Sequence, residues 1–208
     1  MQARELATFG PVIPVIVIHR VEDAVPLAQA LVDGGVRVLE VTLRTPVALK
    51  CMEAIARAVP DAIVGAGTVR SAADAKAAKD AGCQFAVSPG YLRSIGQACR
   101  DLDLPLLPGV ATSSEVMQAN ADGCDFLKFF PATAAGGIPL LKAFAGPFSD
   151  VVFCPTGGIT LDTAPQFLAL PNVKVCGGSW LTPSDAMAAG DWARITRLAK
   201  EASALRGG

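Results

Sequence analysis

Hydrophobic and polar positions divide the chain into two kinds of segment. Short apolar runs predict strands, and longer segments with apolar residues at helical spacing predict helices. The strands are expected at residues 12–18, 36–42, 62–67, 84–88, 105–109, 125–130, 151–155 and 173–177. The helices are expected at residues 22–33, 46–58, 71–81, 91–101, 113–122, 137–145, 161–169 and 184–203.

Three segments, 30–41, 78–87 and 120–129, repeat one local pattern. In each, an alanine-rich helix ends at a glycine that can take a positive φ, and an apolar strand follows. Ser71 and Thr112, each with an acid three residues later, resemble helix N-caps. The pattern predicts repeated strand–helix units.

Eight such units in 208 residues leave about 26 residues for each, with little room for insertions. Strands that alternate with helices pair in parallel, and apolar strands of this kind are buried on both faces. We therefore predict a single α/β domain over residues 1–208, a (β/α)8 TIM barrel with short loops. A doubly wound open sheet is the alternative.

The composition of the chain restricts the kinds of partner that it is expected to bind. The formal net charge is −1 and no basic cluster is present, which argues against a nucleic-acid partner. The apolar run at residues 12–18 is too short to cross a membrane, and the first residues do not resemble a signal sequence. We expect a soluble cytoplasmic protein with no membrane partner.

Metal chemistry is also restricted. The six cysteines (51, 83, 99, 124, 154 and 176) are widely spaced and form no CxxC pair, so buried thiols are expected rather than zinc ligands or disulfides. His19 is the one histidine, which excludes a metal site built on several imidazoles. We expect no metal and no cofactor.

Polar residues follow the predicted strands at their carboxyl ends, where barrel enzymes hold their active sites. Gly157-Gly158 follows the seventh strand, and Gly177-Gly178 with Ser179 follows the eighth. Backbone N–H groups in glycine turns can bind an anion, and these two loops form the recurrent phosphate site of barrels. A phosphate site is therefore predicted, although glycine also serves ordinary turns.

Glu40 lies in an apolar strand, where alternation places it on the face of Val38. If Val38 points into the barrel, Glu40 is an interior carboxylate suited to acid–base catalysis. The alternative is a strand-end glutamate that pairs with Arg44.

Lys128 interrupts the apolar strand at 125–130, on the same face as Phe126 and Phe130. Apolar surroundings disfavour the ammonium and lower the pKa of a lysine, and a neutral amine can form a Schiff base with a carbonyl. The alternatives are a structural lysine paired with Glu40, a snorkelling lysine or a phosphate clamp.

A lysine, a carboxylate and a phosphate site suggest imine chemistry on a phosphorylated keto compound. Arg44 and Thr68 would hold its carboxylate, and Pro89 and the phenylalanines would keep the pocket dry. A surface ion pair remains the alternative for Arg44, and a helix cap for Thr68.

Six motifs carry a specific resemblance. They are Glu40-Val-Thr-Leu-Arg-Thr45, Gly65-Ala-Gly-Thr-Val69, Ser88-Pro-Gly90, Lys128-Phe-Phe-Pro-Ala132, Phe153-Cys-Pro-Thr-Gly-Gly-Ile159 and Gly177-Gly-Ser-Trp-Leu181. In this order, from about residue 12 to 198, the chain resembles the family of 2-keto-3-deoxy-6-phosphogluconate (KDPG) aldolases, also described as 4-hydroxy-2-oxoglutarate aldolases.

The resemblance implies a metal-free class I aldolase of the Entner–Doudoroff pathway on a (β/α)8 barrel, usually a homotrimer. It makes Lys128 the Schiff-base lysine and Glu40 the general acid/base, with Arg44 and Thr68 at the carboxylate. The residues that match the substrate and phosphate loops are Thr156, Gly157, Gly158, Gly178 and Ser179.

His19-Arg20 departs from this pattern, because Arg20 could either reach the phosphate or face solvent, while His19 resembles an ordinary strand-end residue. Two rival functions remain: a phosphate-sugar isomerase or synthase without a covalent step, and a non-catalytic phosphometabolite-binding barrel. The second rival requires Lys128 and Glu40 to form a mutual ion pair. The C4 epimer of the substrate is not predicted.

Overall fold

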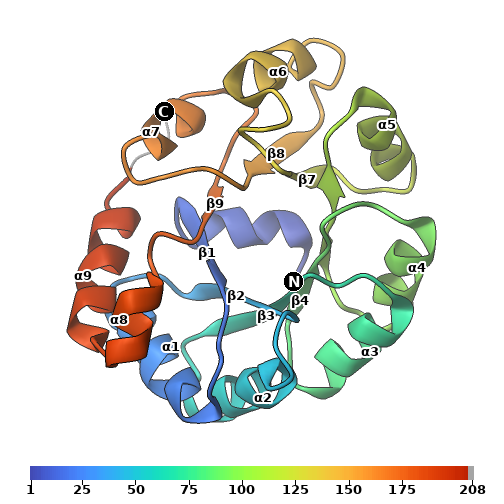
Figure 1. Cartoon of the computed structure of the whole chain (residues 1–208). Helices are drawn as coiled ribbons and strands as arrows, with labels where there is room; N and C mark the ends of the chain where they lie inside the picture. The colour runs from blue at the N-terminus through green and yellow to red at the C-terminus, as the bar shows by residue number, and fades with distance from the viewer. Residues whose placement is uncertain (206–208) are drawn as a thin grey trace.

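The computed structural model describes residues 1–205 and has an α/β fold in which strands and helices alternate (Figure 1). The strands are β1 (Val12–Ile16), β2 (Val38–Thr42), β3 (Ile63–Gly67), β4 (Phe85–Val87), β5 (Leu106–Leu107), β6 (Gly109–Val110), β7 (Phe126–Phe129), β8 (Val152–Pro155) and β9 (Cys176–Gly178). The α-helices are α1 (Ala24–Asp33), α2 (Ala48–Ala58), α3 (Ala72–Asp80), α4 (Arg93–Asp101), α5 (Ser113–Ala121), α6 (Gly137–Phe144), α7 (Ala164–Leu168), α8 (Ser184–Ala189) and α9 (Trp192–Ser203). Two 3-10 helices, η1 (Ala3–Thr8) and η2 (Val21–Asp23), flank β1.

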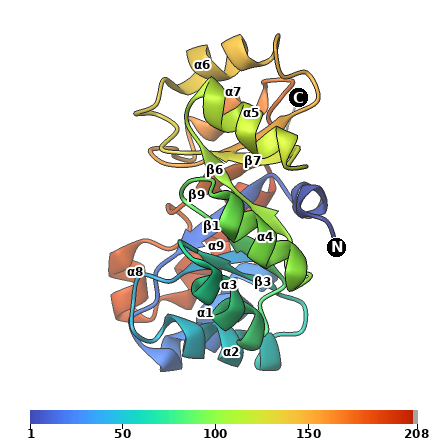
Figure 2. The ribbon, with the colours of Figure 1, turned by 90° about the vertical axis from the view of Figure 1, so that its right-hand side faces the viewer.

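The strands pair in parallel, as predicted, and curl within a surround of helices. One sheet has the order β5-β4-β3-β2-β1-β9 and the other the order β6-β7-β8. Isolated parallel bridges, Phe153 with Val173 and Thr156 with Gly177, link the β8 segment to the segment of β9. Figure 2 shows α5, α6 and α7 on one side of the strands and α1, α2 and α3 on the other.

Pro108 divides the predicted fifth strand, 105–109, into β5 and β6. Proline has no N–H to donate, so the ladder breaks there. The flanking halves serve different neighbours: Leu106 pairs with Ala86, and Gly109 pairs with Lys128. A single short segment therefore joins the two sheets.

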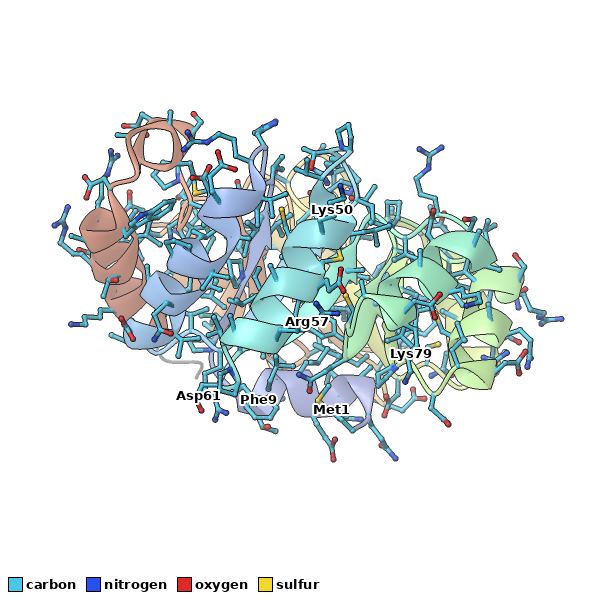
Figure 3. All side chains as sticks on the ribbon, turned by 90° about the horizontal axis from the view of Figure 1, so that it is seen from below. Met1, Phe9, Lys50, Arg57, Asp61 and Lys79 are labelled. Carbon is cyan, nitrogen blue, oxygen red and sulfur yellow. The ribbon has the colours of Figure 1, made fainter. Side chains whose placement is uncertain are left out.

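At one end of the strands, the space that they enclose is filled by apolar side chains and is covered by η1. Alternate residues of the strands point inward, among them Ile13, Val38 and Phe126. Leu6 of η1, only 1% exposed, packs against this interior cluster. In Figure 3, Met1 and Phe9 lie on the opposite edge from Lys50, which is near the start of α2. The sequence analysis did not predict η1.

The helix ends agree with the local rules. Gly35, Gly82 and Gly123 have φ of 87°, 86° and 89°, so each predicted helix-stop glycine uses the left-handed conformation. Both predicted N-caps are confirmed, since the hydroxyls of Ser71 and Thr112 accept hydrogen bonds from backbone N–H groups three residues later.

The prediction of one helix over residues 184–203 is wrong. The helix α8 ends at Ala189, where Gly190 adopts φ 64°, and α9 starts afresh at Trp192. The Asp191 carboxylate caps the new helix by accepting from the Arg194 N–H at 3.0 Å. A glycine followed by a capping residue therefore outweighed the continuous helical spacing.

The six cysteines are free, and five of them are buried, with Cys124 half-buried. Within residues 1–205, no group of three or more His, Cys, Asp or Glu side chains is placed to hold a metal ion. The helices of the described part are too short or too polar to cross a membrane.

Candidate active site

Lys128 and Glu40 meet inside the curled strands. Lys128 Nζ lies 3.0 Å from Glu40 Oε1 and 3.4 Å from Oε2. The side chains are 5% and 3% exposed, respectively. Glu40 comes from β2 and Lys128 from β7, which are not adjacent strands, so the contact crosses the interior. The inward direction predicted for both side chains is confirmed.

The residues around Lys128 and Glu40 explain how the two side chains are accommodated inside the curled strands. Phe126, two residues before Lys128 in β7, belongs to the interior apolar cluster, and the Lys128 amine nitrogen is 5.3 Å from the centre of the Phe130 ring. On the other side, a Cβ at Gly67 would collide with the carboxyl group of Glu40. Glycine in β3 therefore makes the room that the carboxylate occupies.

The contact also revises how the lysine is expected to lose its proton. The sequence interpretation relied on the phenylalanines alone to keep the amine neutral. The structure adds a carboxylate at 3.0 Å that can accept the ammonium proton. Once that proton has moved, the neutral amine can attack a carbonyl. The mutual ion pair required by the non-catalytic alternative is present as well, so the geometry of the pair alone does not choose between them.

Arg44 and Thr68 form a second contact, at the rim. Arg44 Nε donates to Thr68 Oγ1 at 3.1 Å. Arg44 thus pairs with Thr68, and Glu40 pairs with Lys128 instead of Arg44. Thr68 does not cap the next helix, because Ser71 does so.

Thr68 also has an unusual backbone, with φ of 62°. This conformation is rare for a β-branched residue and costs on the order of 1–3 kcal/mol. Such strain is concentrated at functional sites, where it holds a side chain in a chosen place.

The two predicted phosphate loops lie side by side. Thr156, at the end of β8, bridges to Gly177 of β9. The Thr156 hydroxyl, which donates to the Cys154 carbonyl at 3.3 Å, occupies the space that a Cβ at Gly177 would need. Gly157 and Gly158 both have positive φ, 103° and 75°.

The second loop is also tightly built. The ring of Trp180 packs against Gly178, leaving no room for a side chain there. Ser179, between them, is exposed. The two glycine pairs and the Ser179 hydroxyl therefore lie at the adjoining ends of β8 and β9. The phosphate site there stays a prediction.

A cavity of about 630 Å³ opens beside Ser179. Its wall includes Val15 and Val17, His19 and Arg20, and residues of α8. Lys128 and Glu40 are not part of this wall, but Val15 is the register partner of Glu40 in the β1–β2 pair. One residue of the cavity wall is therefore the neighbour of Glu40 on the adjacent strand.

Sequence reasoning left Arg20 open and did not consider Asp23. Arg20 Nε and Nη2 donate to the two Asp23 carboxylate oxygens at 2.8 and 2.7 Å. These hydrogen bonds raise the pKa of Arg20 above its ordinary value. A basic residue three positions before an acid at a helix start was the available signal.

Cys154, one of the predicted buried thiols, lies beside the buried pair, a position that sequence reasoning did not assign. It is the register partner of Lys128, and its Sγ lies 3.8 Å from Thr156 Oγ1. Burial raises the pKa of the Cys154 thiol to about 12, so it is a neutral wall rather than a nucleophile. Alternation along β8 back from Thr156 would have placed it inward.

Pro89 and Phe130, the predicted pocket walls, lie at the ends of β4 and β7. Pro89 is exposed, and its carbonyl packs so closely on Gly109 that a Cβ there would clash with it. Phe130 is half-buried and its ring lies against Gly157 as well as near Lys128. Phe130 therefore lies between the lysine and the predicted phosphate loop at Gly157.

Known proteins resemble this chain over nearly its whole length. The family model described as KDPG and KHG aldolase matches residues 4–198. The KHG/KDPG aldolase of Escherichia coli is 53% identical over 96% of this chain and 94% of its own length. The 2-dehydro-3-deoxy-phosphogluconate aldolase of Pseudoalteromonas atlantica is 50% identical over 98% of this chain and 95% of its own.

Among solved structures, the KDPG aldolase of Legionella pneumophila, with pyruvate captured at low pH as a covalent carbinolamine intermediate, superposes with a TM-score of 0.96. It is 48% identical and the match covers 98% of this chain and 99% of that one. The Zymomonas mobilis ZM4 aldolase with 3-phosphoglycerate gives a TM-score of 0.92 at 48% identity, covering 98% and 95% of the two chains. The matches extend through every strand that carries the site, and the chain belongs to the KDPG and KHG aldolase family.

Proposed function

We propose that this chain is a class I aldolase that cleaves KDPG reversibly to pyruvate and glyceraldehyde 3-phosphate. The observation that carries the proposal is the buried contact of Lys128 Nζ with Glu40 at 3.0 Å in a chain that belongs to the KDPG and KHG aldolase family. An amine and a proton acceptor in one dry interior are what imine chemistry needs. The covalent carbinolamine of pyruvate in the Legionella relative supports the same chemistry.

In the proposed mechanism, Glu40 takes the ammonium proton and the Lys128 amine adds to the C2 ketone. Glu40 then gives this proton to the carbinolamine hydroxyl, which leaves as water and returns Glu40 to its carboxylate form. The resulting protonated imine accepts the electrons released when the C3–C4 bond breaks. Glu40, through a water, removes the proton of the C4 hydroxyl and later returns a proton to the enamine. Glyceraldehyde 3-phosphate leaves first, and hydrolysis of the second imine releases pyruvate.

The two ends of the substrate would be held by different elements. Arg44 and Thr68 would bind the carboxylate, since a guanidinium matches a carboxylate in geometry and charge. The 3-phosphoglycerate in the Zymomonas relative supports a site for a phosphorylated three-carbon group. The residues proposed for that end are Thr156, Gly157, Gly158, Gly178 and Ser179, and Phe130 and Pro89 would wall the space between the ends.

The family description supports 4-hydroxy-2-oxoglutarate as a second substrate, cleaved to pyruvate and glyoxylate. It has the same 2-keto acid end and a C4 hydroxyl, so the Lys128 and Glu40 steps apply unchanged. The isomerase or synthase alternative has no use for a covalent adduct, and the pyruvate adduct in the Legionella relative disfavours it.

We also propose that the strands form one closed (β/α)8 barrel, a single domain over residues 1–208. The continuous segment of β5 and β6 joins the sheets on one side, and the bridge from Thr156 to Gly177 supports closure on the other. A homotrimer is proposed too, and the exposed apolar side chains of Leu92 and Met117, 57% and 63% exposed, suit a subunit contact. The cytoplasmic location and the absence of a metal requirement remain predictions.

Treatment with pyruvate and borohydride tests the proposed function. Reduction of the imine should add a stable three-carbon group to Lys128, which peptide mass spectrometry would locate. Lys128→Ala should give no adduct and no cleavage of KDPG. Lys50→Ala removes an exposed lysine near the start of α2 and is the matched control (Figure 3).

Glu40→Gln separates the acid–base role proposed for Glu40 from the imine formation proposed for Lys128. Loss of an acid–base group typically lowers kcat by about 10²–10⁴-fold, whereas the adduct on Lys128 should still form, more slowly. An unlabelled wild-type protein, under conditions where an established imine aldolase is labelled, would refute the covalent mechanism.

A further inference from the structure

The cavity beside Ser179 is lined by residues that follow β1, by Asp23 of η2 and by residues of α8. Val15, the register partner of Glu40, also lines it. Ser179, at the predicted phosphate loop, is part of the same lining. A substrate extending from Lys128 towards Ser179 therefore points into this space.

Arg20 is the only lysine or arginine among the residues that line the cavity. Its side chain is 53% exposed, so it is open to a ligand, while its partner Asp23 is only 11% exposed. The carboxylate of Asp23 holds Nε and Nη2 of the guanidinium, which leaves Nη1 outside these two bonds. A flexible arginine side chain loses conformational entropy when it binds a ligand. Because Asp23 already holds the Arg20 guanidinium in place, less entropy is lost on binding here.

The surrounding charges oppose simple attraction. Asp23 is negative, and Glu22 Oε1 lies 3.9 Å from Arg20 Nε. His19 is the remaining titratable residue of the wall, and α8 contributes the hydroxyl of Ser184. A phosphate bound here would therefore depend on directed hydrogen bonds from a fixed guanidinium and not on net positive charge.

We propose that Arg20, held in place by Asp23, is a specificity residue that binds the terminal phosphate of the substrate opposite Ser179. This inference rests on the proposed function and adds a side-chain cation to a site otherwise made of backbone N–H groups and hydroxyls. It assigns to Arg20 the distinction between phosphorylated and unphosphorylated 2-keto acids. The first carbons of the substrate, at Lys128, are not involved.

Arg20→Gln tests the proposal with two measurements on the purified full chain. The KM for KDPG should rise about 10-fold with a much smaller change in kcat, because a charge-assisted hydrogen bond to the phosphate is lost. The pyruvate concentration that half-saturates borohydride trapping should change less than twofold, since pyruvate has no phosphate. Arg20→Lys, which keeps the charge but not the planar fork, should give an intermediate KM.

Arg57→Gln is the matched control. Arg57 is likewise exposed and paired with a nearby carboxylate, Glu53, but lies at the other end of α2 from Lys50 (Figure 3) and outside the cavity. It should leave both measurements at the wild-type values. A KM for KDPG within twofold of wild type in Arg20→Gln overturns the proposal, as does an equal loss of pyruvate affinity. If wild type neither traps pyruvate nor cleaves KDPG, the proposed function itself fails.

Discussion

The two ends of the strands use the same interaction, an ion pair, in opposite ways. Each end has a cavity, of about 630 Å³ beside Ser179 and about 570 Å³ beneath η1. At the η1 end, Arg4 and Asp125 form a pair at 2.7 Å in which each side chain is 49% exposed. At the other end, Lys128 and Glu40 are almost fully buried.

Burial decides what such a pair does. Water already solvates an exposed pair, so it contributes about 0–1 kcal/mol to stability. A buried pair has lost that solvation, and its two charges depend on each other. The η1 end therefore carries its charges where solvation makes them inexpensive, whereas the end with Lys128 and Glu40 keeps charges where burial makes them costly.

The largest expected effect comes from breaking each pair in turn. Lys128→Met should lower the free energy of unfolding by about 3–5 kcal/mol, because it leaves the Glu40 carboxylate buried without its partner. Arg4→Ala should lower it by about 1 kcal/mol at most. Urea denaturation followed by circular dichroism measures both.

The double variant Lys128→Met, Glu40→Leu sharpens the test. Replacement of a whole buried pair by apolar residues is often neutral, so most of the lost stability should return while activity stays absent. A double variant as unstable as Lys128→Met would contradict this account, as would equal losses at the two ends.

A smaller effect is expected from relieving backbone strain. Thr68→Gly should raise the free energy of unfolding by about 1 kcal/mol, since glycine adopts φ of 62° without strain but loses some chain entropy. The KM for KDPG should nevertheless rise, because the hydroxyl bonded to Arg44 is gone.

Asp103 provides the control at the η1 end. It also has a positive φ, 47°, and it lines the cavity beneath η1. Asp103→Gly should raise the free energy of unfolding by less than Thr68→Gly does, because aspartate tolerates a positive φ better than threonine. The KM for KDPG should not change, because Asp103 lies at the opposite end of the strands from Lys128. An increase of KM in both variants would mean that the backbone strain at Thr68 has no special link to the site.

The smallest expected effect depends on pH. The hydrogen bonds from Arg93 and Tyr91 lower the pKa of Asp122 to about 2. A carboxyl group with a lowered pKa stabilises the fold above its ordinary pKa, near 4, and that contribution disappears as the pH falls towards 2. Asp122→Asn should therefore lower the urea midpoint at pH 7, and the difference from wild type should shrink below pH 4. A difference that stays constant from pH 7 to pH 3 would show that the ionised form is not responsible.

Local rules predicted the features that depend on near neighbours in the chain. The alternation around Lys128 and Glu40 was sufficient to place both side chains inside, because a strand has a period of two and Val38 and Phe126 mark its inner face. The helix stops at Gly35, Gly82 and Gly123 followed from the conformational freedom of glycine.

Other features depend on contacts that one sequence does not show. The position of η1 is set by Leu6 packing against residues far along the chain. The Lys128–Glu40 contact itself joins residues 88 positions apart, and its 3.0 Å distance follows from how far the strands curl. The same holds for the cavity that Arg20 shares with Ser179, since they lie near opposite ends of the sequence.

Gly67 shows that the absence of a side chain at one position can be a requirement for a functional group at another. Its backbone is that of an ordinary strand residue, so alanine could adopt it. The added methyl group would nevertheless occupy the place of the Glu40 carboxyl group. Substitutions at positions 40 and 67 are therefore coupled. A larger residue at position 67 is expected to fit only when Glu40 has been replaced by a shorter residue, and that replacement would also remove the proposed acid–base group.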